Sequence, residues 1–512
     1  MVTRGEAMMA ALVGGLTLAA AFPPWSAPLL APLGLGAFFL AVSRRGVPSG
    51  AVTGFVFGLA FFGPTLWWLS SSIAPLAWAA LVLLQAAWLA ALGAGTALVR
   101  CLSYWPVWVA SLWTVVEAAR SSVPWGGLPW GRLGYTAVDT PWSFSLALVG
   151  VAGTSTVVAL AGAAVAGIVE AVRARRRVVV VTRPVLVGCL VGGVLLLVSV
   201  AWLPEERGEA ATSRSRSVII AVVQAEVPGD GTDVAAHHRE ITSTLLLETR
   251  RLARTWGAAA PAPDLVVWPE NATAVDPATD STAREALLTA VDVSGGAPML
   301  AGSIVDGPTT TAALNQAVVW TTEGPAGRYT KQHLVPFGEY VPLRPIATRI
   351  SPRVAEIERD MVSGAAPSPL LVDDLALAIA LCFDVAYDDV LREQVAQGAD
   401  LAVVQTSNAM FLGTAQQEQQ WTITRARAIE LGRSVVVSSM NGISGAIASD
   451  GSVIDRLPTA RAGATAVSLP VERGTTLAVR LGAWPARIAY ALGVAGVLAA
   501  CWRARRERAS GA

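Results

Sequence analysis

The sequence predicts an α-helical polytopic membrane domain joined to a layered α/β domain. Of its 512 residues, 53% are hydrophobic and only 15% are charged, well below the charged fraction of an average soluble protein. Apolar residues dominate before residue 204 and again near the C-terminus, whereas residues 217–476 alternate short β-rich runs with helical patterns. A wholly soluble chain is therefore not expected.

Eight apolar runs have roughly the length that crosses a bilayer. They are residues 8–22, 28–43, 51–70, 73–99, 101–116, 144–169, 184–203 and 486–502. The first run has a rival interpretation as a signal peptide, because Arg4 precedes it and Ala19, Ala20 and Ala21 offer a cleavage site. The further runs favour an uncleaved anchor.

Arginine clusters predict the orientation in the membrane. If Arg4 is cytoplasmic, every later cluster falls on the same face, as the positive-inside rule requires. The clusters are Arg44 with Arg45, Arg100, Arg173 with Arg175, Arg176 and Arg177, and the tail residues Arg503, Arg505, Arg506 and Arg508. We therefore expect a multi-pass cell-membrane protein with both termini in the cytoplasm and residues 204–480 outside.

A tryptophan-rich loop, residues 121–142, falls on the outer face in the same count. Its Trp125, Trp130, Tyr135 and Trp142 are expected to mark the membrane interface, with a role in lipid entry as the alternative.

The chain divides into an N-terminal membrane domain of about seven helices (1–203), a linker (204–216), an extracytoplasmic domain (217–476) and a last helix with a basic tail (477–512). Strands are predicted at 218–224, 265–268, 299–304, 317–320, 375–382, 401–405, 434–439 and 465–469, and helices at 233–255, 281–293, 387–397 and 415–432. Strands that are apolar on both faces and separated by helices predict a covered, layered sheet.

Lys331 is the only lysine, among many arginines. A solvated surface lysine would be easily replaced by arginine in such a chain, so this one is expected to be needed as lysine. An ammonium is a compact point charge, whereas a guanidinium is a planar fork. The alternative is that a single lysine persists by accident.

Cys382 and Glu270 each end a predicted apolar strand, in LALAIALC and LVVWPE. Strand ends are where open α/β sheets hold their sites. Taken alone, the cysteine could be an inert core residue and the glutamate a surface cap. With Lys331, however, they supply a base, a thiol nucleophile whose thiolate is reachable near neutral pH, and a cation for a tetrahedral oxyanion.

Five segments resemble the bacterial apolipoprotein N-acyltransferases, a membrane branch of the nitrilase superfamily. They are 329–343 (YTKQHLVPFGEYVPL), 267–270 (VWPE), 222–225 (VVQA), 313–315 (ALN) and 425–433 (RARAIELGR). The order of the segments and the apolar runs on both sides of the polar domain fit the same family, so the resemblance covers nearly the whole chain.

The resemblance implies an α-β-β-α sandwich with Glu270 as general base, Lys331 as oxyanion stabiliser, Cys382 as nucleophile and Glu339 as a supporting carboxylate. It implies that Cys382 takes an acyl chain from a phospholipid and passes it to the α-amino group of a diacylglyceryl-modified apolipoprotein. No cofactor, metal or nucleic acid is expected as a ligand; membrane lipids and the lipoprotein are the expected partners.

The chain departs from the family pattern beside the nucleophile. Where the family commonly has Tyr and Glu, this chain has Phe383 and Asp384. Phe383 lacks the tyrosine hydroxyl, and Asp384 has a shorter arm, so any supporting role of these two residues must work without that hydroxyl and with the shorter carboxylate. Glu226 replaces a common Asn, and a Trp often found a few residues later is missing, so contacts of that loop cannot be carried over.

Several other residues invite functional interpretations. Asn315 and Asn408 are candidates for the pocket, with a turn residue as the alternative for Asn408. His333 beside the lysine is interpreted as structural, since Glu270 can act as base. Arg425 and Arg427 are expected to brace their helix by ion pairs.

Two alternatives to the acyltransferase stay open. One is a membrane-tethered carbon-nitrogen hydrolase (amidase) that releases its acyl group to water. The other is a catalytically silent paralogue that binds lipoproteins, for which the loss of a triad residue would be the expected mark. All three triad residues are present.

Overall fold

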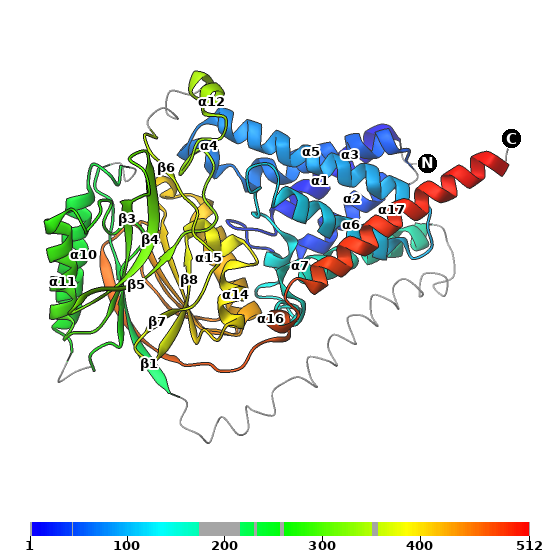
Figure 1. The fold of residues 1–512 in the computed structure, drawn as a ribbon. Coiled ribbons are helices and arrows are strands. Elements are labelled where there is room, and N and C mark those ends of the chain that lie inside the picture. Colours follow the sequence, from blue (N-terminus) through cyan, green and yellow to red (C-terminus); the bar gives the residue numbers. More distant parts are fainter. Residues whose placement is uncertain are drawn as a thin grey trace. The chain divides into compact units, whose positions relative to one another are not determined.

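The computed structural model describes residues 3–43, 45–173, 216–229, 233–256, 261–350 and 357–510. They form two compact units (Figure 1): a helical unit, which contains the described residues before 174 and those from 481 onward, and an α/β unit, which contains those from 216 to 480. The predicted span 184–203 and the arginines at 44 and 175–177 lie outside the described residues.

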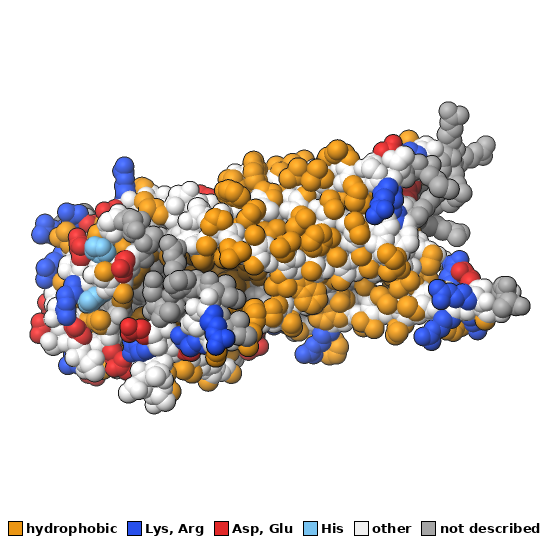
Figure 2. Space-filling view, turned by 90° about the horizontal axis from the view of Figure 1, so that it is seen from above, with side chains coloured by type: hydrophobic (Ala, Val, Ile, Leu, Met, Phe, Trp, Pro, Cys, Tyr) orange, Lys and Arg blue, Asp and Glu red, His pale blue; other side chains and the backbone are white. Residues whose placement is uncertain are grey.

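Seven principal helices and two short ones build the helical unit in the described residues. They are α1 (Arg4–Ala19), α2 (Leu30–Val42), α3 (Val47–Thr65), α4 (Trp68–Ser72), α5 (Pro75–Val99), α6 (Trp105–Arg120), η1 (Leu133–Ala137), α7 (Phe144–Arg173) and α17 (Trp484–Ser510). On the face shown in Figure 2, hydrophobic side chains cover most of the surface over these helices, and charged side chains gather over the α/β unit and at one end of the helical unit.

Four helices of the described residues, α3, α5, α7 and α17, are long and apolar enough to cross a membrane. The predicted runs 8–22, 28–43 and 101–116 form helices of 16, 13 and 16 residues. These are shorter than the roughly 20 residues that span a hydrocarbon core. Their spanning therefore stays a prediction.

Small residues let α3 and α5 pack closely. A Cβ added to Gly54 would lie 2.1 Å from the carbonyl oxygen of Leu89, and one added to Gly93 would lie 2.2 Å from that of Gly50. Such backbone approach is typical of helix pairs in membranes, where packing replaces the hydrophobic effect as the driving force.

The tryptophan-rich loop is folded inward, which corrects part of the interfacial interpretation. Trp130 and Tyr135 are buried, with exposed fractions of 4% and 2%, whereas Trp125 is 44% exposed. Arg120 holds the loop by donating to the carbonyls of Leu128 and Trp130, at 2.9 and 2.8 Å. Trp130 and Tyr135 therefore belong to the core of the unit.

The α/β unit contains two sheets. The first has the order β13-β1-β2-β3-β4-β5, with β6 paired to β4, and the second has the order β12-β11-β10-β9-β8-β7. The strands of the first are β1 (Ser217–Gln224), β2 (Leu265–Val267), β3 (Met299–Asp306), β4 (Ala312–Thr321), β5 (Gly324–Thr330), β6 (Asp360–Met361) and β13 (Gly463–Pro470). Those of the second are β7 (Leu370–Val372), β8 (Leu375–Leu381), β9 (Leu401–Ser407), β10 (Val435–Met440), β11 (Gly445–Ile447) and β12 (Val453–Arg456).

The two sheets pack face to face between two layers of helices. Ser438 of β10 donates to the carbonyl of Val223 in β1, and Gln405 of β9 donates to that of Trp268 after β2. Helices α10 (His238–Ala253) and α11 (Ser281–Val293) cover the first sheet, and α14 (Val390–Ala396) and α15 (Ala415–Leu431) cover the second (Figure 1). Two further short helices, α12 (Arg344–Ile350) and α16 (Leu477–Leu481), lie outside these layers. This α-β-β-α sandwich confirms the predicted fold class.

Several details differ from the sequence-based expectations, including the absence of β6, β7, β11 and β12 from the predicted strands. The edge strand β13 has alternating buried and exposed residues at its C-terminal end, so it is not covered on both faces. Strand β8 ends at Leu381, one residue earlier than predicted, because Cys382 adopts a left-handed backbone with φ 47°. Strand β5, which immediately precedes Lys331, was not predicted.

Candidate active site

Strand ends of both sheets bring the predicted residues together. Glu270 follows β2 and Lys331 follows β5 in the first sheet, and Cys382 follows β8 in the second. Because the two sheets face each other, residues that are far apart in the sequence meet where these strands end. Glu270 and Lys331 are 2% and 1% exposed, so the site excludes most solvent.

Lys331 lies between two carboxylates. Its Nζ donates to Glu270 Oε1 at 3.1 Å and to Glu339 Oε1 at 2.7 Å. Asn315 of β4 donates its Nδ2 to the same two oxygens, at 2.7 and 3.3 Å. Glu339 is held in turn by the backbone N–H of Val335, at 2.8 Å from Oε2. The predicted residues Glu270, Lys331, Glu339 and Asn315 therefore form one hydrogen-bonded cluster.

The second sheet fixes the other oxygen of Glu270. The backbone N–H of Ser407, at the end of β9, donates to Glu270 Oε2 at 2.8 Å. The backbone at Glu270 also runs close to β3, where a Cβ added to Gly302 would lie 2.5 Å from the Glu270 Cα. The hydrogen bond from Ser407 orients the carboxylate, and the close approach to β3 fixes the backbone that carries it.

Lys331 is charged in this environment. Burial by itself lowers the pKa of an ammonium, but the negative charges of Glu270 and Glu339 outweigh it and hold the pKa of Lys331 well above its usual value. The lysine is thus a cation here, and it differs from arginine in that its three N–H donors belong to one nitrogen.

The surroundings of Cys382 raise the pKa of its thiol, which fits the expectation that a carboxylate base takes the thiol proton. Burial and the negative charge of Glu270 raise its pKa to about 12, while Lys331 and a hydrogen bond from Thr406 lower it only in part. A base must therefore remove the proton as the sulfur attacks. The left-handed backbone at Cys382 places the residue in a sharp turn between β8 and the 3₁₀ turn η3 (Cys382–Ala386).

Asp384 ties this turn to the loop that carries Lys331. The side chain is fully buried and accepts from Tyr329 Oη at 2.8 Å, from the His333 backbone N–H at 2.8 Å and from the Leu381 N–H at 3.2 Å. Burial raises the pKa of its carboxyl group. The shorter carboxylate in place of the family's Glu therefore still connects the lysine loop to the nucleophile turn.

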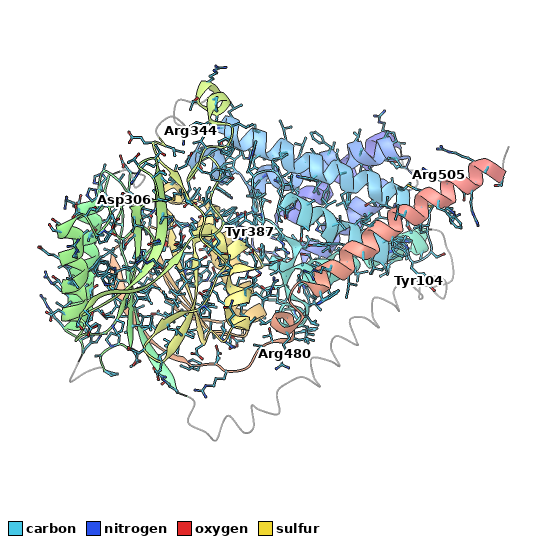
Figure 3. The ribbon with its side chains drawn as sticks, viewed as in Figure 1. Tyr104, Asp306, Arg344, Tyr387, Arg480 and Arg505 are labelled. Atoms are coloured by element: carbon cyan, nitrogen blue, oxygen red, sulfur yellow. The ribbon has the colours of Figure 1, made fainter. Side chains whose placement is uncertain are left out.

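Phe383 and His333 pack against the ring of Tyr387, which is labelled in Figure 3. Phe383 meets the Tyr387 ring edge-on at 5.2 Å, and His333 stacks on it at 3.6 Å. His333 Nε2 lies 3.0 Å from Asp389 Oδ1. These contacts agree with a structural interpretation of His333.

Asn408 is buried in a polar cluster with Gln416 and Gln420. Its Nδ2 donates to Gln416 Oε1 at 2.8 Å and to Gln420 Oε1 at 2.7 Å. Sequence reasoning missed Gln420, whose amide nitrogen lies 3.9 Å from Cys382 Sγ, and Thr406, to which the same nitrogen donates at 3.1 Å. The sequence signal for this cluster is a run of glutamines in α15, namely Gln416, Gln417, Gln419 and Gln420. All four are buried, whereas glutamines on a solvated helix face would be exposed.

No group of three or more His, Cys, Asp or Glu side chains with metal-binding arrangement occurs in the described parts of the chain.

Comparison with known proteins defines the class and then the family. Residues 219–477 match the carbon-nitrogen hydrolase family model, and residues 14–164 match the model of the apolipoprotein N-acyltransferase N-terminal domain. The α/β unit is thus a carbon-nitrogen hydrolase domain.

Curated relatives match over most of the chain. The apolipoprotein N-acyltransferase of Mycolicibacterium smegmatis is 31% identical, over 88% of this chain and 77% of the relative. That of Methylococcus capsulatus is 28% identical, over 99% of this chain and 97% of the relative. The chain belongs to the apolipoprotein N-acyltransferase family. It is accordingly an acyltransferase and, with its apolar helices, a multi-pass membrane protein.

Among solved structures, an amidase from Nesterenkonia sp. overlaps with 51% of this chain and 92% of its own, at 18% identity and a TM-score of 0.37.

Proposed function

We propose that the chain moves an acyl group from a phospholipid, through a thioester on Cys382, to the α-amino group of a diacylglyceryl-modified apolipoprotein. The observation that carries the proposal is the buried cluster in which Lys331 bridges Glu270 and Glu339 beside the Cys382 turn. Family membership supports the acyl donor and acceptor classes.

In the first half-reaction, the Cys382 sulfur attacks the ester carbonyl of the phospholipid while Glu270 takes the thiol proton. The carbonyl oxygen gains negative charge, which Lys331 stabilises. Collapse of the tetrahedral intermediate breaks the ester C–O bond, and Glu270 returns its proton to the departing lysophospholipid oxygen. The product is a thioester on Cys382.

In the second half-reaction, the neutral α-amine of the lipoprotein attacks the thioester carbonyl. Glu270 takes a proton from the nitrogen, and Lys331 again holds the oxyanion. The C–S bond then breaks, the sulfur regains a proton from Glu270, and the acyl group leaves as an amide on the lipoprotein. Atoms and protons balance over the two halves.

The number of donors on Lys331 suits this role. An ammonium has three N–H groups, and two are directed at Glu270 and Glu339 in the described structure. The third remains for the oxyanion. We further propose that residues 204–480 lie outside the cytoplasm, where the outer leaflet supplies both lipid substrates, as the arginine clusters predict.

The test is a reconstitution of the full chain in vesicles that contain phospholipid with a labelled acyl chain and a diacylglyceryl-cysteine peptide. We expect the label on the peptide amine, detected by mass spectrometry. Cys382→Ser should abolish transfer, whereas Cys501→Ser, a matched change at an exposed cysteine of the helical unit, should not.

Two other outcomes would contradict the proposal. Label released as free fatty acid in the presence of the peptide would favour the hydrolase. No thioester and no transfer, with peptide binding retained, would favour the silent paralogue.

A further inference from the structure

Helix α17 has an exposed tryptophan at each end of its apolar stretch. Trp484 and Trp502 are 60% and 57% exposed, and residues 488–501 between them carry no charged side chain. The two tryptophans are 18 positions apart, which corresponds to about 27 Å along a helix. This length is close to the roughly 30 Å of a hydrocarbon core, whose limits tryptophans commonly mark. The helix beyond Trp502 therefore extends into the headgroup layer.

Arg503 attaches this last part of α17 to the rest of the helical unit. Its Nη1 donates to the carbonyl oxygen of Cys101, just after α5, at 2.9 Å. Its Nε lies 2.8 Å from Glu507 Oε1, one helical turn further on. The charge of Arg503 is therefore balanced by Glu507, and its contact with Cys101 fixes where the segment begins.

The next arginines of α17 are exposed and have no such balance. No carboxylate of the described residues forms an ion pair with Arg505, Arg506 or Arg508. Arg506 instead places its guanidinium 3.7 Å from the centre of the Trp502 ring. Figure 3 labels Arg505 on the same turns of the helix. Three positive charges thus lie just past the tryptophan that marks the interface.

Further arginines lie at the same end of the helical unit. Arg100, next to Cys101, pairs with Glu170 of α7 and donates to Ser43 Oγ, just after α2, at 3.0 Å. Arg45 follows Ser43 by two residues. Charged side chains gather at this end of the unit on the face drawn in Figure 2. The positive charge of α17 is therefore reinforced by neighbouring helix ends.

We propose that the last turns of α17 bind the headgroups of anionic phospholipids in the leaflet that faces this end of the helical unit, through Arg505, Arg506 and Arg508. A guanidinium fork matches the oxygens of a headgroup phosphate. A basic residue next to an anionic membrane surface strengthens binding by about fivefold. The inference concerns the helical unit alone and does not depend on the proposed acyl transfer.

The surroundings of these arginines favour a lipid over a soluble anion as the ligand. Trp502 and the apolar stretch before it hold the segment at headgroup depth, where lipid phosphates are concentrated. A zwitterionic lipid also has a phosphate but no net charge. Arginines that lack an acidic partner should therefore discriminate between anionic and zwitterionic lipids.

The experiment is native mass spectrometry of the full chain released from detergent micelles after titration with phosphatidylglycerol or phosphatidylcholine of identical acyl chains. We expect phosphatidylglycerol to bind on the order of tenfold more tightly, because one headgroup contacts only some of the three arginines. In the triple variant Arg505→Gln, Arg506→Gln and Arg508→Gln, the two lipids should bind within about twofold of each other. The corresponding triple change to Lys keeps the charge and should keep most of the preference.

A matched triple variant controls for the loss of net charge. Arg250→Gln, Arg254→Gln and Arg328→Gln remove the same charge from exposed positions of the α/β unit. This variant should bind phosphatidylglycerol as selectively as the parent, since the positions lie outside the proposed headgroup site.

Four results would overturn the inference. They are equal affinity of the parent for the two lipids, an unchanged preference in the α17 glutamine variant, an equal loss of preference in the α/β control, and displacement of phosphatidylglycerol by an equal concentration of glycerol phosphate. The last result would identify a site for soluble anions. Because lipid binding is measured without any acceptor, a failure of acyl transfer would leave the inference standing.

Discussion

A lysine at position 331 offers a geometry that arginine lacks. Its nitrogen reaches Glu270 and Glu339 and still has a third N–H, whereas a guanidinium spreads its donors over a plane. The site is closed around this nitrogen, since the side chain is 1% exposed. A positive charge alone would therefore not replace the Lys331 ammonium in this site.

Lys331→Arg should therefore lose acyl transfer by at least about 100-fold, the scale of removing one oxyanion donor. The rate of thioester formation measures it. Arg328→Lys, at an exposed site of strand β5, which precedes Lys331, is the reciprocal control and should behave like the parent. Normal turnover by the Lys331→Arg variant would refute the argument.

The raised pKa of Cys382 gives a second prediction at this scale. With a pKa of about 12, the thiolate fraction should rise about tenfold per pH unit between pH 8 and 11, and so should alkylation of the folded protein. In denaturant the pKa returns toward its ordinary value, so the profile should level off near pH 9 to 10. A plateau at pH 9 in the folded protein would contradict a raised thiol pKa at Cys382.

At the residue scale, the sequence was sufficient for some positions and not for others. Glu270, Lys331 and Cys382 could be predicted because each follows a recognisable strand or stands out in composition. Thr406 and Gln420 could not be predicted. The direction of a polar side chain in β9 or α15 depends on how the two sheets and the helix pack together, which the sequence alone does not give.

At the scale of elements, helix α15 braces the turn that carries the nucleophile. Arg427 donates to the carbonyls of Val385 and Ala386, both at 2.9 Å, and pairs with Asp388 and Glu430. The side chain is 1% exposed. The predicted bracing role of Arg427 therefore extends from its own helix to η3.

Arg427→Met should destabilise the folded α/β unit by about 3–5 kcal/mol, because Glu430 would be left as an uncompensated buried charge. Chemical denaturation of the reconstituted chain measures the loss. Arg425→Met is the matched control: Arg425 is only half-buried and donates to the Gly451 carbonyl, so a smaller loss, about 1 kcal/mol, is expected. Equal losses of unfolding free energy in the two variants would show that the contacts of Arg427 with η3 add no stability.

Element boundaries show where sequence patterns fail. Strand β5 (GPAGRYT) is short of apolar residues and lies at the edge of its sheet, so neither periodicity nor hydrophobicity marks it. The end of β8 was misplaced by one residue because the left-handed turn at Cys382 is a tertiary feature. The strand propensity of the sequence continues through Cys382, but the extended backbone ends at Leu381.

At the scale of the whole molecule, the division into a helical part and an α/β part was readable from hydropathy. The α-β-β-α layering is predicted by family resemblance alone, because pairings such as β1 with β13 join residues that are 239 to 253 positions apart. Local patterns carry no information about such partners.

The orientation can be tested with cysteines that the chain already has. Cys101 and Cys501 are exposed on the helical unit, close in sequence to the basic clusters predicted to be cytoplasmic. In a chain with Cys189 and Cys382 changed to serine, a membrane-impermeant maleimide should label them only after cells are permeabilised. Thr322→Cys, at the exposed turn between β4 and β5, should be labelled in intact cells. The reverse labelling pattern would mean that residues 204–480 lie in the cytoplasm, contrary to the proposed orientation.

The most direct measurement is tandem mass spectrometry of the protein after brief exposure to phospholipid with a labelled acyl chain and no acceptor. We predict the label on the peptide that contains Cys382, as a thioester that hydroxylamine removes and an added lipopeptide amine consumes. A stable label on any other residue, or turnover without a label on Cys382, would contradict the mechanism.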